Sequence, residues 1–170
     1  MMQRRRLLQL GLGAAATLAL VGGGVALMRP GLVEGRLSDD ARALMRSVAL
    51  AVLDGSLPAA EGGREAALAS HLERVQGTID GFPSAMRSEL SQLLGLLCTG
   101  AGRITLAGLR TDWPQASIAQ VQSALQAMNL SSLALRQQAF HALRDLTNGA
   151  FYADPSTWPL IGYPGPRSIG

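Results

Sequence analysis

The sequence has no lysine: all fifteen of its basic residues are arginine. The formal net charge is +3, but four arginines lie near the N-terminal end: Arg4, Arg5, Arg6 and Arg29. From residue 31 onward, eleven arginines stand against twelve acidic residues. A nucleic-acid-binding surface needs an excess of basic side chains to neutralise phosphates. The body of this chain has no such excess, so nucleic acid is excluded as its expected partner.

Cysteine and histidine are also scarce. Cys98 is alone in the sequence and cannot form an internal disulfide, a cysteine-rich zinc site or an iron–sulfur cluster by itself. His71 and His141 are seventy residues apart, and no Gly-x-Ser-x-Gly nucleophile motif is present. We therefore expect a protein that is not an enzyme and that carries no cofactor or metal of its own.

The first thirty residues are predicted to be a targeting segment. Arg4 and Arg5 are followed by one further residue and then by Leu7 and Leu8, a pattern that resembles the twin-arginine export motif. An ordinary secretory signal is the alternative. Residues 7–28 are uncharged and rich in glycine and alanine. No clear Ala-x-Ala cleavage site precedes the boundary, and twenty-two residues of helix can just span a bilayer core of about 30 Å. A cleaved signal and a retained inner-membrane anchor both remain open.

Residues 31–150 are predicted to form one all-α domain, a small bundle of about five helices. Their apolar side chains recur at helical spacing, and no segment shows the alternation of a strand. Ser38 is a predicted N-cap, and Ser117 with Gln120 forms a predicted capping box. The five helices are expected from Ser38 to Asp54, from about Arg64 to Ile79, from Pro83 to Leu97, from Ser117 to Met128, and from Ser131 or Ser132 to a stop at Asn148-Gly149.

Residues 151–170 are predicted to be an extended tail rich in aromatic and proline residues. Four of the seven aromatic residues and four of the eight prolines of the chain lie between positions 151 and 166. Proline lowers the entropy lost on ordering, and aromatic side chains are enriched in protein interfaces. The composition fits a tail that docks onto a partner, and it fits equally a tail that covers its own bundle.

The run Phe-Tyr-Ala-Asp-Pro-Ser-Thr-Trp-Pro-Leu-Ile-Gly-Tyr-Pro-Gly-Pro, behind a twin-arginine signal, resembles the small subunit of membrane-bound FAD-dependent sugar and polyol dehydrogenases. That family includes the small subunits of sorbitol, fructose and glucose dehydrogenases, with a looser likeness to subunit 3 of gluconate 2-dehydrogenase. The resemblance implies a large flavoprotein subunit that binds FAD and oxidises the sugar, with a multihaem cytochrome c as a further subunit. It also implies that the small subunit carries the folded flavoprotein through the twin-arginine translocase into the periplasm.

The resemblance assigns roles to residues at both ends of the chain. The export signal would comprise Arg4, Arg5, Leu7 and Leu8. The surface that binds the large subunit would comprise Tyr152, Pro155, Gly162, Tyr163, Pro164 and Gly165, which match the family's tail. The aromatic residues Phe151 and Trp158 of the same stretch are added to it as candidate interface residues. Cys98 is expected either to be a buried small apolar residue or to form a disulfide with the partner subunit. The alternative function is a free-standing, membrane-anchored helical protein of the periplasm with a structural or regulatory role.

Overall fold

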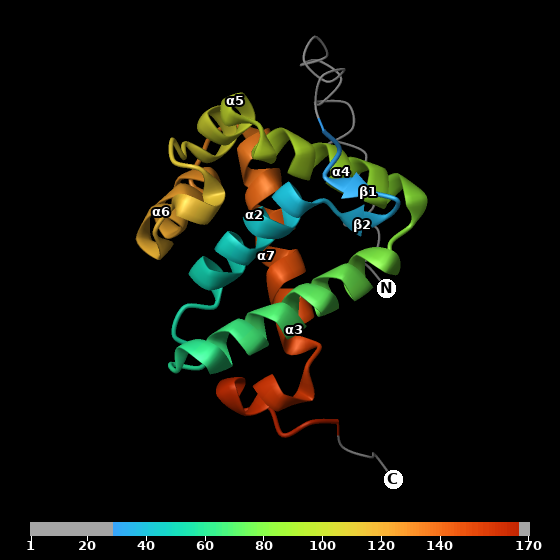
Figure 1. The fold of residues 1–170 in the computed structure, drawn as a ribbon, viewed down its shortest axis with the longest axis vertical. Helices are drawn as coiled ribbons and strands as arrows, with labels where there is room; N and C mark the ends of the chain where they lie inside the picture. Colours follow the sequence, from blue (N-terminus) through green and yellow to red (C-terminus); the bar gives the residue numbers. More distant parts are fainter. Residues whose placement is uncertain (1–28, 167–170) are drawn as a thin grey trace.

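The computed structural model describes residues 29–166, and the predicted export residues Arg4, Arg5, Leu7 and Leu8 lie outside this range. The described chain is mostly helical, as predicted (Figure 1). Five longer helices carry the fold: α2 (Asp39–Val52), α3 (Glu61–Asp80), α4 (Ser84–Cys98), α6 (Ile118–Asn129) and α7 (Ala134–Tyr152). Shorter helical turns connect or follow them: α5 (Gly100–Gly102), η3 (Arg103–Ala107), η4 (Trp113–Gln115) and η5 (Pro155–Ile161).

Two helix starts follow directly from local chemistry, as the sequence predicted. The side chain of Ser38 accepts a hydrogen bond from the backbone N–H of Ala41 at 3.3 Å and caps α2. At the start of α6, the Ser117 hydroxyl accepts from the N–H of Gln120, and the Gln120 side chain accepts from the N–H of Ser117. These reciprocal bonds satisfy backbone donors that would otherwise lack partners.

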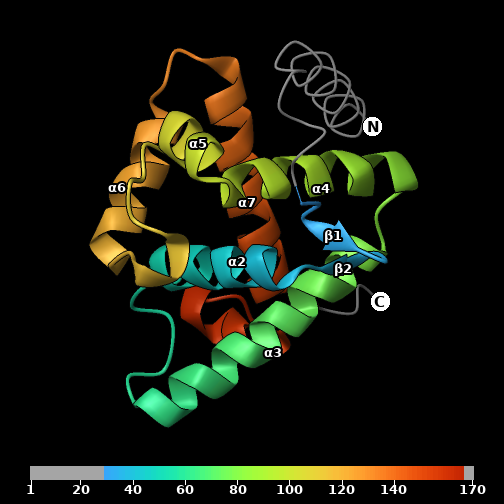
Figure 2. The same cartoon turned by 45° about the horizontal axis from the view of Figure 1, so that its top comes forward.

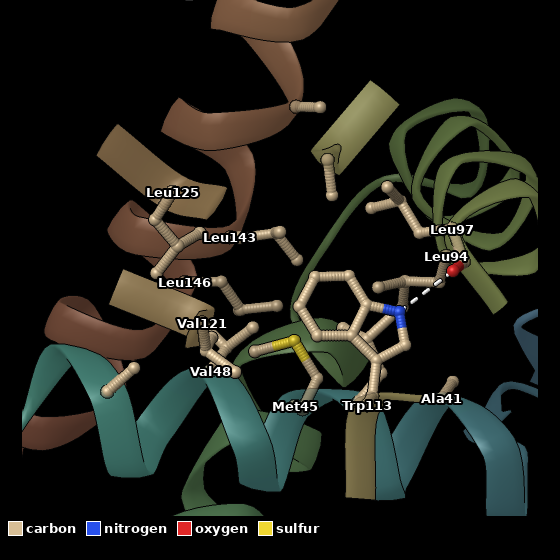
Figure 3. Close-up of a cluster of buried hydrophobic side chains, with 14 of the residues drawn as sticks. Ala41, Met45, Val48, Leu94, Leu97, Trp113, Val121, Leu125, Leu143 and Leu146 are labelled. Carbon is tan, nitrogen blue, oxygen red and sulfur yellow. Dashed lines mark hydrogen bonds between the residues drawn. The ribbon is translucent and has the colours of Figure 1, made fainter. Parts of the chain in front are cut away.

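Helix α2 lies at the centre of the bundle and packs against α3, α4, α6 and α7 (Figure 2). Leu44, Met45 and Val48 on this helix are fully buried. Met45 and Val48 point toward apolar side chains of the surrounding helices (Figure 3). Trp113 enters this core from η4 and donates its indole N–H to the carbonyl oxygen of Leu97 at 2.8 Å. The hydroxyl of Ser47 in turn donates to the carbonyl oxygen of Trp113 at 2.8 Å. Both the indole N–H and the backbone carbonyl of the buried Trp113 therefore have hydrogen-bond partners, as polar groups in a core usually do.

A small β-hairpin precedes α2, which the sequence did not predict. Strands β1 (Leu32–Val33) and β2 (Arg36–Leu37) pair antiparallel around Glu34 and Gly35, which both have positive φ angles of 51° and 81°. Two consecutive residues with positive φ are characteristic of the tight turns that suit hairpins. Strands of two residues are too short to show an alternating pattern, which is why they could not be predicted from the sequence.

The predicted end of the last helix was wrong. Helix α7 continues through Asn148 and Gly149 to Tyr152, because the additional turn buries Ala150 and Phe151. The segment that follows is also not extended as predicted. It forms the 3-10 helix η5, which ends where Gly162 adopts a left-handed conformation with φ of 68°.

Candidate functional site

The C-terminal tail begins at Phe151, whose side chain is buried in the bundle. Phe151 is buried in a small cluster with Ala49, Leu53 and Leu68, and its ring lies edge-on to that of His71, 6.4 Å away. Phe151 thus fixes the tail to α2 and α3. Phe151 was predicted to belong to a partner-binding surface, but the structure turns its side chain inward and buries it.

A set of hydrogen bonds then shapes the turn from α7 into η5. The Thr157 hydroxyl is buried and lies within hydrogen-bond distance of the carbonyl oxygens of Phe151, at 3.0 Å, and of Asp154, at 2.8 Å. The Asp154 carboxylate accepts from the N–H of Ser156 at 2.9 Å and lies 3.1 Å from the guanidinium of Arg74. Hydrogen bonds from Ser156, and more weakly the charge of Arg74, hold the pKa of Asp154 below its usual value.

Trp158 organises the second half of the tail. Its indole N–H donates to the carbonyl oxygen of Tyr152 at 2.8 Å, and its ring meets that of Tyr163 edge-on at 5.2 Å. Gly162 turns the chain back so that the N–H of Tyr163 bonds to the carbonyl oxygen of Trp158 at 3.1 Å. Gly165 then passes so close that a Cβ atom there would lie 3.3 Å from the indole ring. Gly162 and Gly165 therefore permit the fold of the tail, and Trp158 holds it.

Four large side chains of the tail remain exposed on this structured segment: Tyr152 (39%), Leu160 (61%), Ile161 (56%) and Tyr163 (44%). We call these four residues the tail surface. Pro155, Pro159 and Pro164 beside them are exposed as well. Apolar side chains held in the open by a structured backbone are characteristic of interaction sites.

The structure thus separates the predicted tail residues into two groups. Phe151 and Trp158 hold the tail in place, whereas Tyr152 and Tyr163 face solvent with Pro155 and Pro164. Leu160 and Ile161 were missed, although an apolar pair between Pro159 and Gly162 could have drawn attention to them. A further exposed apolar pair, Leu130 (72%) and Leu133 (62%), lies at the α6–α7 connection.

Cys98 lies at the end of α4, half-buried beside a small cavity. The cavity is lined by Arg29, Pro30, Ser38, Asp40, Gly95, Cys98 and Thr99. Burial and, to a smaller extent, the carboxylate of Asp40 raise the pKa of the thiol to about 11. A thiol with so high a pKa is a weak nucleophile at neutral pH.

The two histidines are placed very differently. His71 is fully buried on α3, and neither ring nitrogen has a hydrogen-bond partner within residues 29–166. Burial first, and the charge of Arg74 second, lower its pKa to about 4, so the imidazole is neutral at pH 7. His141 is exposed on α7, where Asp145, one turn further on, is paired with Arg144 at 2.7 Å.

Between residues 29 and 166, no group of three or more His, Cys, Asp or Glu side chains is placed to hold a metal ion. No single helix in the same range has the length and apolar composition needed to cross a membrane. α4 together with residues 100–107 meets both criteria only as a pair bent by 87°. Leu94 and Leu97 of this pair are fully buried in the bundle core.

Comparison with known proteins provides no relative. No protein-family model matches the chain, and neither a curated protein nor a solved structure does.

Proposed function

We propose that this chain is a non-catalytic small subunit that escorts a periplasmic FAD-dependent sugar or alcohol dehydrogenase. The chain would bind the folded flavoprotein and carry it through the twin-arginine translocase. The FAD would belong to the partner, and a multihaem cytochrome c would be a further subunit. The proposal rests on the resemblance of the two ends of the sequence to that family and on the geometry of the tail.

The tail surface is the observation that carries the proposal. Tyr152, Leu160, Ile161 and Tyr163 are exposed on a segment whose backbone is already fixed by Phe151, Thr157 and Trp158. A preformed surface loses little conformational entropy on binding, so more of its contact energy appears as affinity. Exposed tyrosines beside aliphatic side chains are also the residue types that anchor interfaces.

A folded cargo is consistent with such a surface. A flavoprotein must acquire FAD in the cytoplasm, and the twin-arginine route transports proteins that are already folded. An escort for such a cargo needs a docking site that is complete before transport, which the structured tail would provide. The signal in residues 1–30 would then serve both chains.

Co-purification tests the proposal. The tagged chain is expressed with the flavoprotein encoded beside it, if one is present, and recovered from the periplasmic fraction. We expect the wild-type eluate to show flavin absorbance and sugar-dependent dye reduction. Both signals should be lost when Leu160 and Ile161 are changed to Ser. The matched control changes Leu130 and Leu133 to Ser, because these leucines are at least as exposed but lie outside the tail. A chain recovered without flavin would favour the free-standing membrane-anchored protein instead.

A further inference from the structure

The connection between α6 and α7 presents two leucines to solvent on an ordered turn. Leu130 is 72% and Leu133 is 62% exposed, more than any other large apolar side chain within residues 29–166. The N–H of Leu133 donates to the Ser131 hydroxyl at 3.2 Å, and the N–H of Leu130 donates to the carbonyl oxygen of Gln126 at 3.0 Å. A hydrogen-bonded backbone therefore holds both leucines outward.

Residues of η3 lie beside this turn. The Nε of Arg136, three residues after Leu133, donates to the carbonyl oxygen of Leu106 at 2.7 Å. Its guanidinium also lies 3.7 Å from the position that a Cβ atom on Gly108 would occupy. The N–H of Gly108 donates to the carbonyl oxygen of Ile104 at 3.1 Å, and the side chain of Ile104 is 49% exposed. A third exposed apolar residue therefore belongs to a turn that packs against the start of α7.

We call the surface formed by these segments the tip surface. Its members are three apolar residues and two arginines: Ile104, Leu130, Leu133, Arg110 and Arg136. Arg110 is exposed two residues after Gly108 and lines an open groove of about 490 Å³ between residues 107–111 and α6. The tip surface thus places guanidinium groups beside apolar side chains.

The charges around the tip surface are almost all of one sign. Residues 90–144 contain four arginines and a single acidic residue, Asp112. Asp112 is already paired with Arg103, which is buried. This stretch therefore offers Arg110 and Arg136 no free carboxylate, and the surface keeps a net positive charge.

Helix α6, which leads into the tip surface, carries no charged residue at all. Its outward positions hold small or amide side chains, and these are exposed: Ala119, Ser123, Gln126 and Ala127. The carboxylate of Asp54 approaches the helix at Gln122, at 3.3 Å, two turns before Leu130. Charged residues normally occupy the solvent-facing side of a helix, and their depletion marks surfaces that leave water on binding.

We propose that the tip surface docks onto a bilayer that contains anionic phospholipids. Ile104, Leu130 and Leu133 enter the boundary of the acyl chains. The guanidinium groups of Arg110 and Arg136 meet the lipid phosphates. Apolar burial combined with attraction to anionic head groups is what reversible attachment to a membrane surface requires. The inference rests on residues 104–136 and does not depend on the escort role proposed above.

Charge favours a lipid surface over a second copy of this chain. In a symmetric pair, the same patch lies on both sides of the interface. Arg110 and Arg136 of two copies would then approach each other without a carboxylate between them, whereas a bilayer supplies phosphates. The α6–α7 connection projects at the top of Figure 2, and η5 lies on the other side of α2. The tail surface therefore stays accessible when the tip surface is docked.

Fluorescence quenching in vesicles tests the docking. The full-length chain carries Cys98→Ser, so that a single introduced thiol takes a nitrobenzoxadiazole probe. The probe is attached at Ser132→Cys, between the tip surface residues, or at Ser156→Cys in η5, and both serines are exposed. The chain is reconstituted with phosphatidylethanolamine–phosphatidylglycerol vesicles that contain nitroxide-labelled lipid. We expect the lipid to quench the probe at position 132 and to leave the probe at position 156 bright.

Variants measure each contribution to docking. Leu130→Ser with Leu133→Ser should lower the ratio of docked to undocked chains at least about tenfold, because leucine burial is lost. Arg110→Gln should lower it roughly fivefold, the contribution of one cation near an anionic surface. Leu160→Ser with Ile161→Ser is the matched control, because these residues are similarly exposed but belong to the tail surface. It should leave the quenching unchanged, and circular dichroism verifies that each variant is folded.

Several outcomes would overturn the inference. They are equal quenching at positions 132 and 156, quenching that survives the double leucine variant, and equal quenching in neutral phosphatidylcholine vesicles. Light scattering in detergent tests for a second copy: a wild-type dimer that the double leucine variant dissociates would assign the tip surface to self-association instead. Loss of flavin from the same variant during co-purification would assign it to the flavoprotein.

Discussion

The guanidinium of Arg74 lies 3.1 Å from the carboxylate of Asp154, and its Nε donates to the carbonyl oxygen of Ala150 at 3.1 Å. One side chain of α3 thus joins the last turn of α7 to the first residues of the tail. A cation at this place also compensates the partial negative charge at the C-terminal end of α7.

Changing Arg74 to Met should loosen the tail without unfolding the bundle. We expect the backbone amides of residues 155–163 to exchange hydrogen faster, with a change in melting temperature of only a few degrees, because the pair is partly exposed. Hydrogen exchange followed by mass spectrometry measures the protection of the tail and of the bundle in one experiment. Arg46→Met is the control, since it breaks an exposed pair with Glu65 elsewhere on the bundle. Equal protection of the tail in both variants would contradict the role given to Arg74.

His71 should make the protein less stable in acid. Its pKa is lowered from 6.5 to about 4 in the folded protein, so the unfolded chain binds more protons in this range. The free energy of unfolding should therefore fall as the pH drops from about 6.5 to about 4, by up to about 3 kcal/mol. His71→Leu should remove this loss and raise the melting temperature, because the buried ring has no hydrogen-bond partner to lose.

Urea denaturation of this variant between pH 7 and pH 4 measures the effect. His141→Leu provides the control for loss of a histidine outside the core, because His141 is exposed on α7. A wild-type protein whose stability is constant across this range would show that His71 has a partner in solution.

The helices could be predicted from the sequence where local chemistry decides them. Ser38 and Ser117 cap the helices that follow them, and the apolar spacing identified the buried faces of the five long helices. The end of α7 could not be predicted, because Asn148-Gly149 is a good local stop. The helix continues past it since Phe151 finds a buried site against α2 and α3, a tertiary contact that local sequence does not reveal.

The tail and the N-terminal end of the bundle also depend on tertiary contacts that the sequence does not reveal. Composition drew attention to the tail, but it did not predict that Trp158 folds back on Tyr152 or that Leu160 and Ile161 stay exposed. The backbones of Gly31 and Gly95 also approach closely, although the two residues are sixty-four positions apart: a Cβ atom on Gly31 would lie 2.9 Å from the backbone nitrogen of Gly95. A close approach of two backbones at such a separation leaves no pattern in a single sequence.

Cys98 should react slowly in the folded protein. With a pKa of about 11, roughly one thiol in ten thousand is ionised at pH 7, and the side chain is half-buried. We expect maleimide labelling to be slow in buffer and complete in urea. We also expect the chain to separate from the proposed flavoprotein partner on electrophoresis without reductant. A single band for the complex that resolves only with reductant would establish the intersubunit disulfide instead.

If the proposed escort role holds, replacing both Arg4 and Arg5 with Lys should block export of this chain and of the flavoprotein that we propose it carries. The twin-arginine translocase recognises the two guanidinium groups, and lysine keeps the positive charge but lacks the planar donor group. Cell fractionation with assay of periplasmic dehydrogenase activity measures the outcome. Arg29→Lys is the control and should be exported normally. Undiminished periplasmic activity in the double variant would show that the flavoprotein is exported without this chain.

Truncating the tail surface should weaken partner binding and spare the bundle. A buried aromatic anchor in an interface is often worth about 2 kcal/mol, so Tyr163→Ala should lower affinity roughly thirtyfold. Its melting temperature should stay near that of the wild type, because Tyr163 is exposed. Trp158→Ala should weaken binding too, through loss of its hydrogen bond to Tyr152 and of its contact with Tyr163.

Phe151→Ala should instead lower the stability of the bundle. Its ring is buried, and its loss should cost about 3–5 kcal/mol of folding free energy. Calorimetry measures the melting temperature of the three variants, and surface-immobilised binding measures their affinity for the flavoprotein. Together they distinguish a tail that docks onto the partner from a tail that covers its own bundle. If Tyr163→Ala behaves like Phe151→Ala, with a large fall in melting temperature and unchanged affinity for the flavoprotein, the tail covers its own bundle. If it loses affinity and keeps its melting temperature, the exposed tyrosine belongs to the interface.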